Sequence, residues 1–374
     1  MKIRAAILEE SGRALPNARS KPLTVGTVEL APPGAGEALI RIAAAGLCHS
    51  DLSVINGDRP RPVPMVLGHE AAGIVEALGA GVDDLAVGDH VVMVFVPSCG
   101  HCNPCAEGRP ALCEPAARAN GAGEMLGGGR RLARGGEAVH HHMGVSAFAE
   151  AAVISRRSLV KVPKDLPLAE AALFGCAVLT GVGAVVNTAR VRVGQSVAVI
   201  GLGGVGLAAL LGAAAAGAAR IVAVDLEPAK LELARQLGAT DAVDARDADA
   251  AERIRALTGG GVDHAFEMAG STKALELAWN VTRRGGTTTT AGLPHPSQRL
   301  ALPATQLVAE ERTLKGSYVG SCVPSRDVAR YVELYRRGKL PVDRLMSGTL
   351  RLDDINAGFD RLADGAAVRQ VVAF

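Results

Sequence analysis

The pattern of apolar and polar positions changes character near residue 178. Before that point, apolar residues come in short runs such as EALIRIAAAG, AAGIVEALG and GDHVVMVFV, bounded by glycine and aspartate turn signals. Runs of this kind are typical of β-strands joined by turns. No long amphipathic helix interrupts them before residue 167. The pattern therefore predicts an irregular, mostly antiparallel β domain.

From about residue 178 onward, apolar strands alternate with helix-forming segments. SVAVIG predicts a buried strand, GVGLAALLGAAAAG a helix that ends in glycine, and RIVAVD a second strand. In PAKLELARQLG, Pro228 stands where a first helical residue belongs and Gly238 where a C-terminal cap belongs. GVDHAFEMAG and GGTTTTAG predict later strands. This alternation favours an α/β fold, a doubly wound parallel sheet with helices on both faces.

Near the end of the chain, RDVARYVELYRRGKL predicts a helix and RQVVAF a closing strand. The 374 residues are 48% hydrophobic, which is enough for two domains with substantial cores. The 40 basic and 38 acidic side chains give a net charge of +2, which argues against a polyanion-binding surface. Aromatic residues make up only 3%, so stacking platforms for single-stranded nucleic acid are not indicated.

Neither the N-terminus nor the most apolar stretch predicts export or membrane insertion. The apolar run in MKIRAAILEESG is short, and Glu9 and Glu10 follow it at once, so it is a poor signal peptide. Residues 196–219 contain the GLGGVG turn and predict strand, turn and helix rather than a membrane span. We therefore expect a cytoplasmic protein, in which cysteines stay reduced.

Four of the seven cysteines lie within fifteen positions with the spacing C-x2-C-x2-C-x7-C, at Cys99, Cys102, Cys105 and Cys113. Short gaps of this kind let a loop wrap four thiolates around a tetrahedral zinc ion. Disulfides are one alternative, although cysteines three apart pair poorly and the expected compartment is reducing. An iron–sulfur cluster is another. Because four protein ligands leave no open position, the sequence predicts a structural zinc site.

A second set of candidate metal ligands is spread along the chain. Cys48 lies in GLCHSD, His69 in GHEAAG and Cys176 in FGCAVLTG. A lone buried cysteine is usually a small core residue. Together, however, two cysteines and one histidine form the ligand set of a catalytic zinc with an open fourth position, which acidifies a bound alcohol. Asp51 and Glu70 are predicted to orient His69 and tune the metal.

The GLGGVG segment is a candidate nucleotide-binding turn. Gly201, Gly203 and Gly206 form G-x-G-x-x-G between a predicted strand and a predicted helix. Asp225 ends the next strand, 19 residues beyond Gly206, where a carboxylate accepts hydrogen bonds from the adenosine ribose. The carboxylate would repel a 2′-phosphate, so NAD is favoured over NADP. The alternative is a structural glycine turn in which Asp225 caps a helix.

Taken together, these segments resemble the zinc-dependent medium-chain alcohol dehydrogenases. The likeness covers essentially the whole chain and runs through GLCHSD, GHEAAGIVEALGAGV, the four-cysteine loop, FGCAVLTG, GLGGVG, GAARIVAVD, ELARQLGAT and VRQVVAF. It is strongest to the dimeric branch, which includes class I enzymes and glutathione-dependent formaldehyde dehydrogenase. That branch has a longer stretch after the fourth structural cysteine, matched here by residues 114–147.

The resemblance implies a GroES-like β-rich catalytic domain over residues 1–177 and 321–374, and a Rossmann NAD-binding domain over 178–320. It implies that Cys48, His69 and Cys176 bind the catalytic zinc and that Ser50 passes the alcohol proton onward. The implied cofactor contacts are His49, Thr180, Val205, Lys230, Leu293, Val319 and Arg369, beside the glycine turn and Asp225. Phe95, His142 and Met143 fall where the family lines its substrate pocket. A homodimer is implied, with a tetramer as the alternative.

Several positions depart from the family pattern. Ser53 replaces the histidine that ends the proton relay in class I members, so either Ser53 or water completes the relay. Arg59 and Arg118 occupy pocket-mouth positions that are apolar in the ethanol-type enzymes, and His142 replaces an aromatic residue. These departures favour a medium-sized, aromatic or polar-tailed alcohol over ethanol.

Three functions therefore stay open. The first is an NAD-dependent zinc dehydrogenase that interconverts an alcohol and an aldehyde or ketone, with a small-molecule substrate and no nucleic-acid or membrane partner. The second is a thiol-adduct dehydrogenase of the formaldehyde type, matched loosely through Asp58 and Arg118. The third is a non-catalytic zinc- and nucleotide-binding protein, against which the balanced charge and the complete zinc ligand set both weigh.

Overall fold

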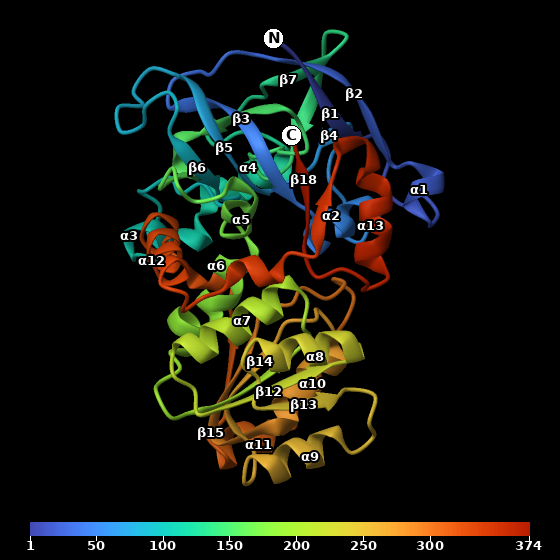
Figure 1. Cartoon of the computed structure of the whole chain (residues 1–374), viewed down its shortest axis with the longest axis vertical. Helices are drawn as coiled ribbons and strands as arrows, with labels where there is room; N and C mark the ends of the chain where they lie inside the picture. Colours follow the sequence, from blue (N-terminus) through green and yellow to red (C-terminus); the bar gives the residue numbers. More distant parts are fainter. The chain divides into compact units, whose positions relative to one another are not determined.

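The computed structural model describes all residues from 1 to 374 and divides them into two compact units (Figure 1). The first unit contains residues 1–176, 323–332 and 346–374, and the second contains 177–322 and 333–345. None of the helices is both long enough and apolar enough to cross a lipid bilayer.

A small closed barrel forms one part of the first unit. Its strands are ordered β1 (Lys2–Leu8), β2 (Leu23–Leu30), β7 (Leu132–Arg134), β8 (Glu137–His141) and β4 (Met65–Val66), and β4 pairs with β1 to close it. Alternate apolar residues of these strands, including Ile3, Val28 and Leu132, fill a common core. The prediction of a β-rich, turn-rich domain before residue 178 is thereby confirmed.

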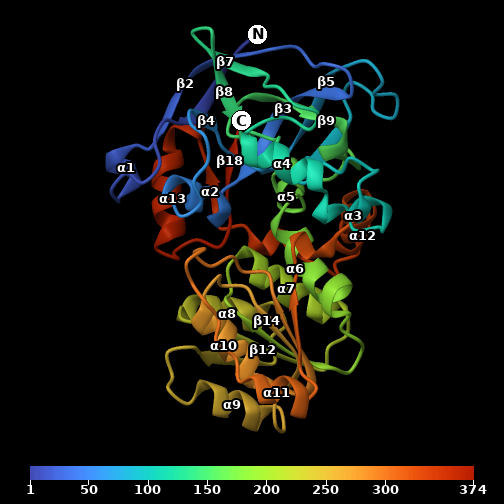
Figure 2. The ribbon, with the colours of Figure 1, turned by 180° about the vertical axis from the view of Figure 1, so that it is seen from behind.

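A second sheet in the same unit carries the residues of greatest chemical interest. Its order is β10 (Leu159–Val162), β6 (His90–Met93), β5 (Glu70–Leu78), β3 (Glu37–Gly46), β18 (Gln370–Ala373) and β17 (Gly348–Leu350), and β9 (Ala151–Ser155) also pairs with β3. The closing strand predicted from RQVVAF is β18, which runs antiparallel to β3 (Figures 1 and 2). The final residues of the chain are therefore integral to this sheet.

Short helices connect these strands. They are α1 (Asn17–Ser20), α2 (His49–Ile55), α3 (Asn103–Ala106), α4 (Glu114–Ala122), α5 (Leu168–Leu173) and α13 (Ile355–Ala363), with 3-10 turns at Pro110–Leu112, Arg156–Ser158 and Leu352–Asp354. Helix α2 buries Leu52, Val54 and Ile55, which fixes the direction of its first turn. That first turn follows Cys48 directly.

The second unit is built on a six-stranded, wholly parallel sheet. Its order is β13 (Asp241–Asp244), β12 (Arg220–Asp225), β11 (Ser196–Ile200), β14 (Val262–Glu267), β15 (Thr282–Thr290) and β16 (Thr313–Gly316). The intervening helices are α6 (Ala177–Gly183), α7 (Gly204–Ala215), α8 (Pro228–Gln236), α9 (Ala250–Leu257), α10 (Thr272–Val281) and α11 (Ala304–Ala309), with a π-helical segment at Ala184–Ala189 and a 3-10 turn at Val319–Ser321. The strand order reverses between β11 and β14, where sheets of this type bind ligands. This confirms the doubly wound α/β prediction.

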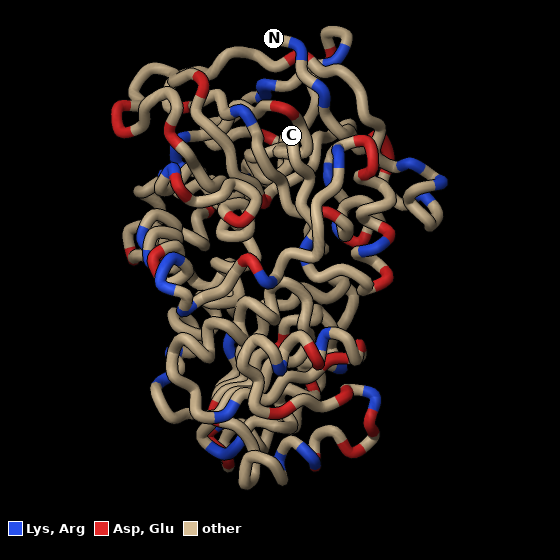
Figure 3. The backbone as a smooth tube through the Cα atoms, in the orientation of Figure 1, with Lys and Arg blue, Asp and Glu red and all other residues tan.

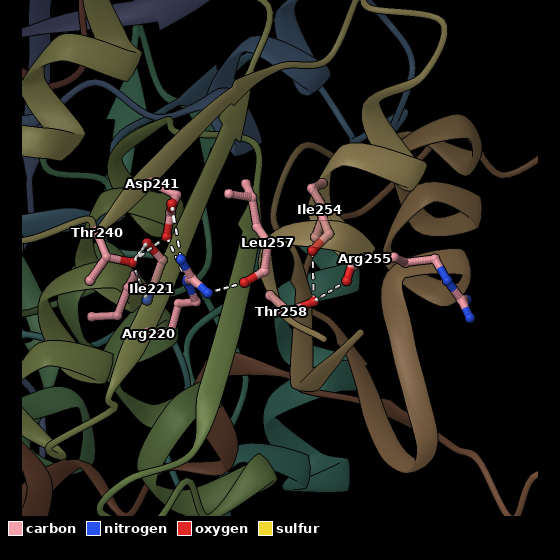
Figure 4. Close-up of polar contacts among 8 residues, drawn as sticks. All are labelled: Arg220, Ile221, Thr240, Asp241, Ile254, Arg255, Leu257 and Thr258. Atoms are coloured by element: carbon pink, nitrogen blue, oxygen red, sulfur yellow. Dashed lines mark hydrogen bonds and ion pairs between the residues drawn. The ribbon is translucent and has the colours of Figure 1, made fainter. Parts of the chain in front are cut away.

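A polar cluster ties the outer strands of this sheet to α9 (Figure 4). Arg220 donates to Asp241 at 2.9 Å and also to the carbonyl of Leu257, at the end of α9. Thr258 donates to the carbonyl of Ile254 at 2.6 Å and closes the last turn of that helix. Basic and acidic residues are interspersed along both units (Figure 3). This arrangement agrees with the near balance of charges in the sequence.

Helix α12 (Pro324–Arg336) corresponds to the helix predicted from RDVARYVELYRRGKL and begins two residues earlier. The structural division assigns residues 333–345 to the second unit, whereas the resemblance assigns 321–374 to the catalytic domain. Within the second unit, the 3-10 turn Val342–Leu345 packs against α7, and Arg344 donates to the carbonyl of Gln236 at 2.9 Å. These contacts explain why residues 333–345 belong to the second unit rather than to the first.

Candidate active site and metal centres

The four clustered cysteines converge in a loop of the first unit. Helix α3 and the turn Pro110–Leu112 fold the loop back, so that the sulfur atoms of Cys99, Cys102, Cys105 and Cys113 all lie within 4.8 Å of one another. None of the seven cysteines forms a disulfide. The disulfide alternative considered from the sequence therefore has no support in the fold.

Backbone N–H groups prepare this loop for thiolate ligands. The amides of His101 and Cys102 donate to Cys99 Sγ at 3.5 and 3.3 Å, and the amide of Cys99 donates to Cys113 Sγ at 3.2 Å. The His101 and Cys102 amides lower the pKa of Cys99 to about 6, because they stabilise its thiolate. A closed set of four sulfur donors, one already acidified, fits a tetrahedral zinc ion.

The second cysteine–histidine set also converges, and it is buried. Cys48 precedes α2, His69 precedes β5 and Cys176 follows α5, and their ligand atoms lie within 4.8 Å of one another. The hydrogen-bonding contact between Cys48 and Cys176 lowers the pKa of the Cys48 thiol and raises the pKa of the Cys176 thiol. Two sulfurs this close to each other and to His69 can bind one cation together.

His69 shows most clearly that this set fits a metal. Its Nδ1 lies 3.0 Å from Asp51 Oδ1, while its Nε2 is buried without a hydrogen-bond partner. When Nδ1 of the neutral imidazole donates a hydrogen bond to the Asp51 carboxylate, Nε2 keeps its lone pair. A fully buried nitrogen lone pair without a donor is costly unless a ligand satisfies it. The geometry therefore suits a zinc ion bound by Nε2 and the two sulfurs.

Asp51 is shared between two imidazoles. Besides His69, it faces His142, whose Nε2 is 3.3 Å from Asp51 Oδ1, and the amide of Gly68 donates to the same oxygen at 3.2 Å. Burial tends to raise the pKa of Asp51, but the charge of His69, its hydrogen bond and the nearby His142 imidazole outweigh burial and lower it. Burial likewise opposes protonation of His69, yet the charges of Asp51 and Cys48 raise the pKa of that imidazole.

Glu70 and Arg369 form a second buried charged pair near the cysteines. Arg369 Nη2 lies 3.7 Å from Glu70 Oε2, and Nη1 donates to the carbonyl of Leu47 at 2.9 Å. Arg369 is only 3% exposed. Burial disfavours its charge, but Glu70 and the thiols of Cys48 and Cys176 raise its pKa. Arg369, which the resemblance predicts to contact the cofactor, is thus bound to Glu70 and to the Leu47 carbonyl, beside Cys48.

The residues predicted to line the pocket fall into two groups. Phe95 and His142 pack edge-on against His69, with ring centroids 5.1 and 5.6 Å away. Met143 follows His142 and is partly buried. Arg59 is partly buried, whereas Arg118 is exposed on α4. The structure thus brings Phe95 and His142 next to His69 but does not bury Arg118.

The first turn of α2 carries the predicted proton-relay residues. Ser50 is partly buried and His49 is exposed, two residues and one residue beyond Cys48. Ser53 donates its hydroxyl to the carbonyl of His49 at 2.9 Å, one helical turn back. The Ser53 hydroxyl hydrogen is therefore used in a hydrogen bond within α2.

The predicted nucleotide turn lies at the carboxyl end of β11 in the second unit. Gly201 has φ of 92°, and a Cβ there would lie 2.7 Å from the amide nitrogen of Ala269. A Cβ on Gly206 would collide with the carbonyl of Gly201, whereas Gly203, the N-cap of α7, faces open space. This is the steric pattern of a turn that leaves a helix N-terminus accessible to phosphate.

Asp225 ends β12 beside this turn. Its carboxylate accepts from the amides of Leu202 and Glu227, at 2.6 and 3.0 Å. The other predicted cofactor residues in this unit are distributed as follows: Lys230 on α8 and Val205 on α7 are partly buried, Thr180 on α6 and Val319 are buried, and Leu293 beyond β15 is exposed. The strand ends bring the turn and Asp225 together, as expected for a nucleotide site.

Sequence reasoning singled out neither Arg61 nor Asn120. Asn120 Nδ2 donates to the carbonyl of Phe95 at 2.9 Å and so supports the wall beside His69. Arg61 has a buried Nε without a hydrogen-bond partner. Burial is the main cause of the lowered pKa of His142, and the charge of Arg61 adds to it. The available signal was the segment RPRPVP, in which prolines flank Arg61 on both sides.

This combination of a zinc-ligand set, a closed four-cysteine loop and a parallel-sheet nucleotide turn defines a zinc-binding dehydrogenase. Residues 34–164 match the family model of the alcohol dehydrogenase GroES-like domain, and residues 204–337 match that of the zinc-binding dehydrogenases. The chain belongs to the zinc-binding medium-chain alcohol dehydrogenase family.

Individual relatives extend this likeness over the full length. The chain is 39% identical, over 100% of both chains, to the S-(hydroxymethyl)glutathione dehydrogenase of Synechocystis sp., and 39% identical, over 95% of both, to alcohol dehydrogenase class-3 of Drosophila melanogaster. Among solved structures, benzyl alcohol dehydrogenase from Acinetobacter calcoaceticus is similar with a TM-score of 0.93 and 33% identity, over 100% of this chain and 99% of that one.

Proposed function

We propose that this zinc-dependent alcohol dehydrogenase oxidises the hydroxymethyl adduct of a thiol with NAD. The observation that carries this proposal is the full-length similarity, at 39% identity, to an enzyme named for S-(hydroxymethyl)glutathione. The motifs alone favour a medium-sized or aromatic alcohol, with the thiol adduct as the alternative, whereas the similarity to known enzymes favours the thiol adduct. In the proposed reaction the carbinol carbon loses a hydride to NAD⁺ and its hydroxyl loses a proton, which leaves a thioester.

An aromatic alcohol is the second candidate. The similarity to benzyl alcohol dehydrogenase supports it, because that structure is 33% identical over the whole chain. Phe95, beside His69, offers an apolar ring on which an aromatic substrate could pack. The substrate panel described below separates the two candidates.

In this proposal, Cys48, His69 and Cys176 hold the catalytic zinc, and the four-cysteine loop holds a structural one. The catalytic zinc, when bound, supplies Lewis acidity that lowers the pKa of an alcohol. Asp51 holds His69 with Nε2 toward the cysteine pair. Ser50 is the proposed proton carrier from the alcohol, since it lies in the same turn as Cys48 and its hydroxyl can both accept and donate. Because Ser53 is bonded within α2, water is the proposed end of the relay.

Incubating the protein with NAD⁺, formaldehyde and glutathione tests the reaction directly. We expect NADH formation to require both formaldehyde and the thiol, with a kcat/KM at least about tenfold above that for benzyl alcohol, a discrimination that corresponds to about 1.4 kcal/mol. Benzyl alcohol as the better substrate would establish the second candidate instead. No turnover with either class would contradict both.

Cofactor choice is proposed to depend on Asp225. Asp225→Gly should raise the KM for NAD about tenfold or more and increase relative use of NADP, because the ribose acceptor and the charge that repels a 2′-phosphate are both lost. Asp225→Asn, which keeps the size but not the charge, serves as the matched variant. It separates repulsion from the support that the carboxylate gives to the Leu202 amide. An unmodified protein that prefers NADP would refute the assignment.

We propose a homodimer in which the sheets of two second units join through β16. This strand is at the edge of the sheet, pairing only with β15, and Leu314 within it is exposed. Val308, just before it, is 81% exposed. Unpaired strand edges with apolar neighbours are natural places for association. A monomer in sedimentation at assay concentrations would contradict this proposal. A cytoplasmic location stays a prediction from the sequence.

A further inference from the structure

The three successive histidines of the HHH segment have different partners. His140 Nδ1 accepts a hydrogen bond from Arg130 Nε at 3.1 Å, and His141 Nε2 accepts one from the amide of Arg131 at 2.9 Å. Both ring nitrogens of His142 are instead buried without a hydrogen-bond partner. The first two histidines thus support the chain just before β7, whereas the third needs a separate explanation.

The surroundings of His142 point to the candidate catalytic metal centre. Its Nε2 lies 3.3 Å from Asp51 Oδ1, and its ring packs edge-on against His69, with the centroids 5.6 Å apart. The same carboxylate oxygen accepts hydrogen bonds from the amide of Gly68 and from His69 Nδ1, while Oδ2 has no partner. The negative charge of Asp51 favours the His142 tautomer with its proton on Nε2. His142 therefore acts on Asp51 as a third N–H dipole, although the contact is not a regular hydrogen bond.

The backbone on both sides of His142 is tied to the segment that leads into His69. Before the histidine, strand β8 pairs with the short strand β4. Beyond it, the amide of Ala147 donates to the carbonyl of Gly68 at 3.0 Å. The distance between the two imidazoles is therefore determined by main-chain hydrogen bonds as well as by side-chain packing.

The turn that follows His142 has an unusual backbone. Met143, Gly144 and Ser146 have φ of 53°, 66° and 54°. Residues other than glycine rarely adopt this left-handed region, so holding Met143 and Ser146 there costs free energy. The His142 amide donates to Ser146 Oγ at 2.9 Å, and the Val145 amide donates to the His142 carbonyl at 3.0 Å, which closes the turn. Strained turns of this kind cluster where the position of a side chain matters for function.

Packing alone does not account for an imidazole at this position. A phenylalanine ring would keep the edge-on contact with His69 without burying two unpartnered nitrogens. The histidine therefore lowers stability relative to phenylalanine, and the charged group that its Nε2 approaches is Asp51. Because Asp51 in turn holds His69 through Nδ1, we expect the benefit at the metal ligand.

We propose that His142 is a positioning residue of the catalytic zinc centre: it fixes the Asp51 carboxylate on Nδ1 of His69 and thereby slows the loss of zinc. The inference rests on the proposed function, in which Cys48, His69 and Cys176 hold the metal, and adds a residue outside that ligand set. A carboxylate behind a metal-binding imidazole fixes the orientation of the ring and raises its basicity. Losing such a partner typically lowers metal affinity about 10- to 100-fold.

Zinc release to a chelator tests the proposal on the full-length, zinc-loaded protein. 4-(2-pyridylazo)resorcinol reports each released ion by its absorbance, and the phase that is missing in Cys48→Ala identifies the catalytic site. His142→Phe should release this zinc about tenfold faster than the parent and leave the phase from the four-cysteine loop unchanged. His142→Gln, which restores an N–H donor, should recover part of the difference. His140→Gln, in the same histidine segment, should change neither phase.

A double variant tests whether His142 acts through Asp51. Asp51→Asn alone should accelerate release of the catalytic zinc at least as much as His142→Phe does. Adding His142→Phe to Asp51→Asn should then increase the rate by less than about twofold, because residues that act through one another give non-additive effects. Two full effects that multiply in the double variant would overturn the proposal.

Stability separates positioning from packing. Because His142→Phe removes two unpartnered buried nitrogens, its melting temperature in excess zinc should stay within about 2 °C of the parent or rise. Zinc release at the parental rate, or faster release from both sites together with a melting temperature lowered by more than about 5 °C, would overturn the role of His142. Failure of the proposed function has another signature: two release phases in Cys48→Ala would refute the catalytic zinc site, and this inference with it.

Discussion

Cys48→Ala is expected to abolish alcohol oxidation while the fold and NAD binding persist. The substitution removes one of three ligands from a buried site in which the remaining pair, His69 and Cys176, cannot hold zinc tightly. Loss of the metal's Lewis acidity corresponds to several kcal/mol of activation energy, or about a thousandfold or more in rate. NADH formation measures the activity, and metal analysis should find two zinc ions per chain in the parent and one in the variant.

A matched cysteine provides the control for this experiment. Cys322 is fully buried but lies outside both cysteine-containing sets of candidate metal ligands, so Cys322→Ala should retain both zinc ions and most of the activity. Normal turnover in Cys48→Ala would remove the catalytic assignment of the Cys48, His69 and Cys176 set. Loss of both zinc ions together would show instead that the variant had unfolded.

Cys102→Ser is expected to destabilise the protein and to lower its zinc content at the same time. Cys102 is the N-cap of α3, and its sulfur is one of four that close the loop. Metal binding by such a loop is folding free energy, so losing one ligand should cost several kcal/mol and about 10 °C or more in melting temperature. Calorimetry and metal analysis on the same sample measure both effects.

The effect of Cys102→Ser on activity should follow unfolding rather than chemistry. Below its transition temperature, the residual folded fraction should keep the kcat of the parent, because this site has no open coordination position. Glu107→Ala, at an exposed position in the same loop, should leave stability and both zinc ions unchanged. A stable Cys102→Ser protein that retains two zinc ions would be incompatible with a closed four-sulfur site.

The sequence was most informative where chemistry depends on local spacing. The four clustered cysteines are within one loop, so their convergence follows from short chain reach alone. Gly201, Gly203 and Gly206 likewise sit in one strand–turn–helix unit, and the β11 and α7 boundaries match it. The two-part architecture was also visible, because strand and helix periodicities differ and each is a property of neighbouring residues.

The surroundings of His69 were harder to predict from the sequence. The sequence drew attention to Arg59 and Arg118, but solvent exposure on α4 distinguishes Arg118 from Arg61, whose Nε is buried. Which arginine lacks a carboxylate or carbonyl partner depends on every other side chain around it. The spacing of residue types along the chain therefore does not predict which arginine lacks a hydrogen-bond partner.

The sequence by itself determined the fold class of each of the two domains, because that follows from the periodicity of apolar residues. It also determined the cysteine loop and the nucleotide turn, because these depend on contacts between residues close in the chain. Only the tertiary structure decided that Asp51 is shared by His69 and His142, which are 73 positions apart, and that β18 pairs with β3 beside Arg369 and Glu70. Those arrangements depend on the pairing of distant strands. The burial of these strands determines which polar groups meet and which, like His69 Nε2 and Arg61 Nε, stay without a hydrogen-bond partner.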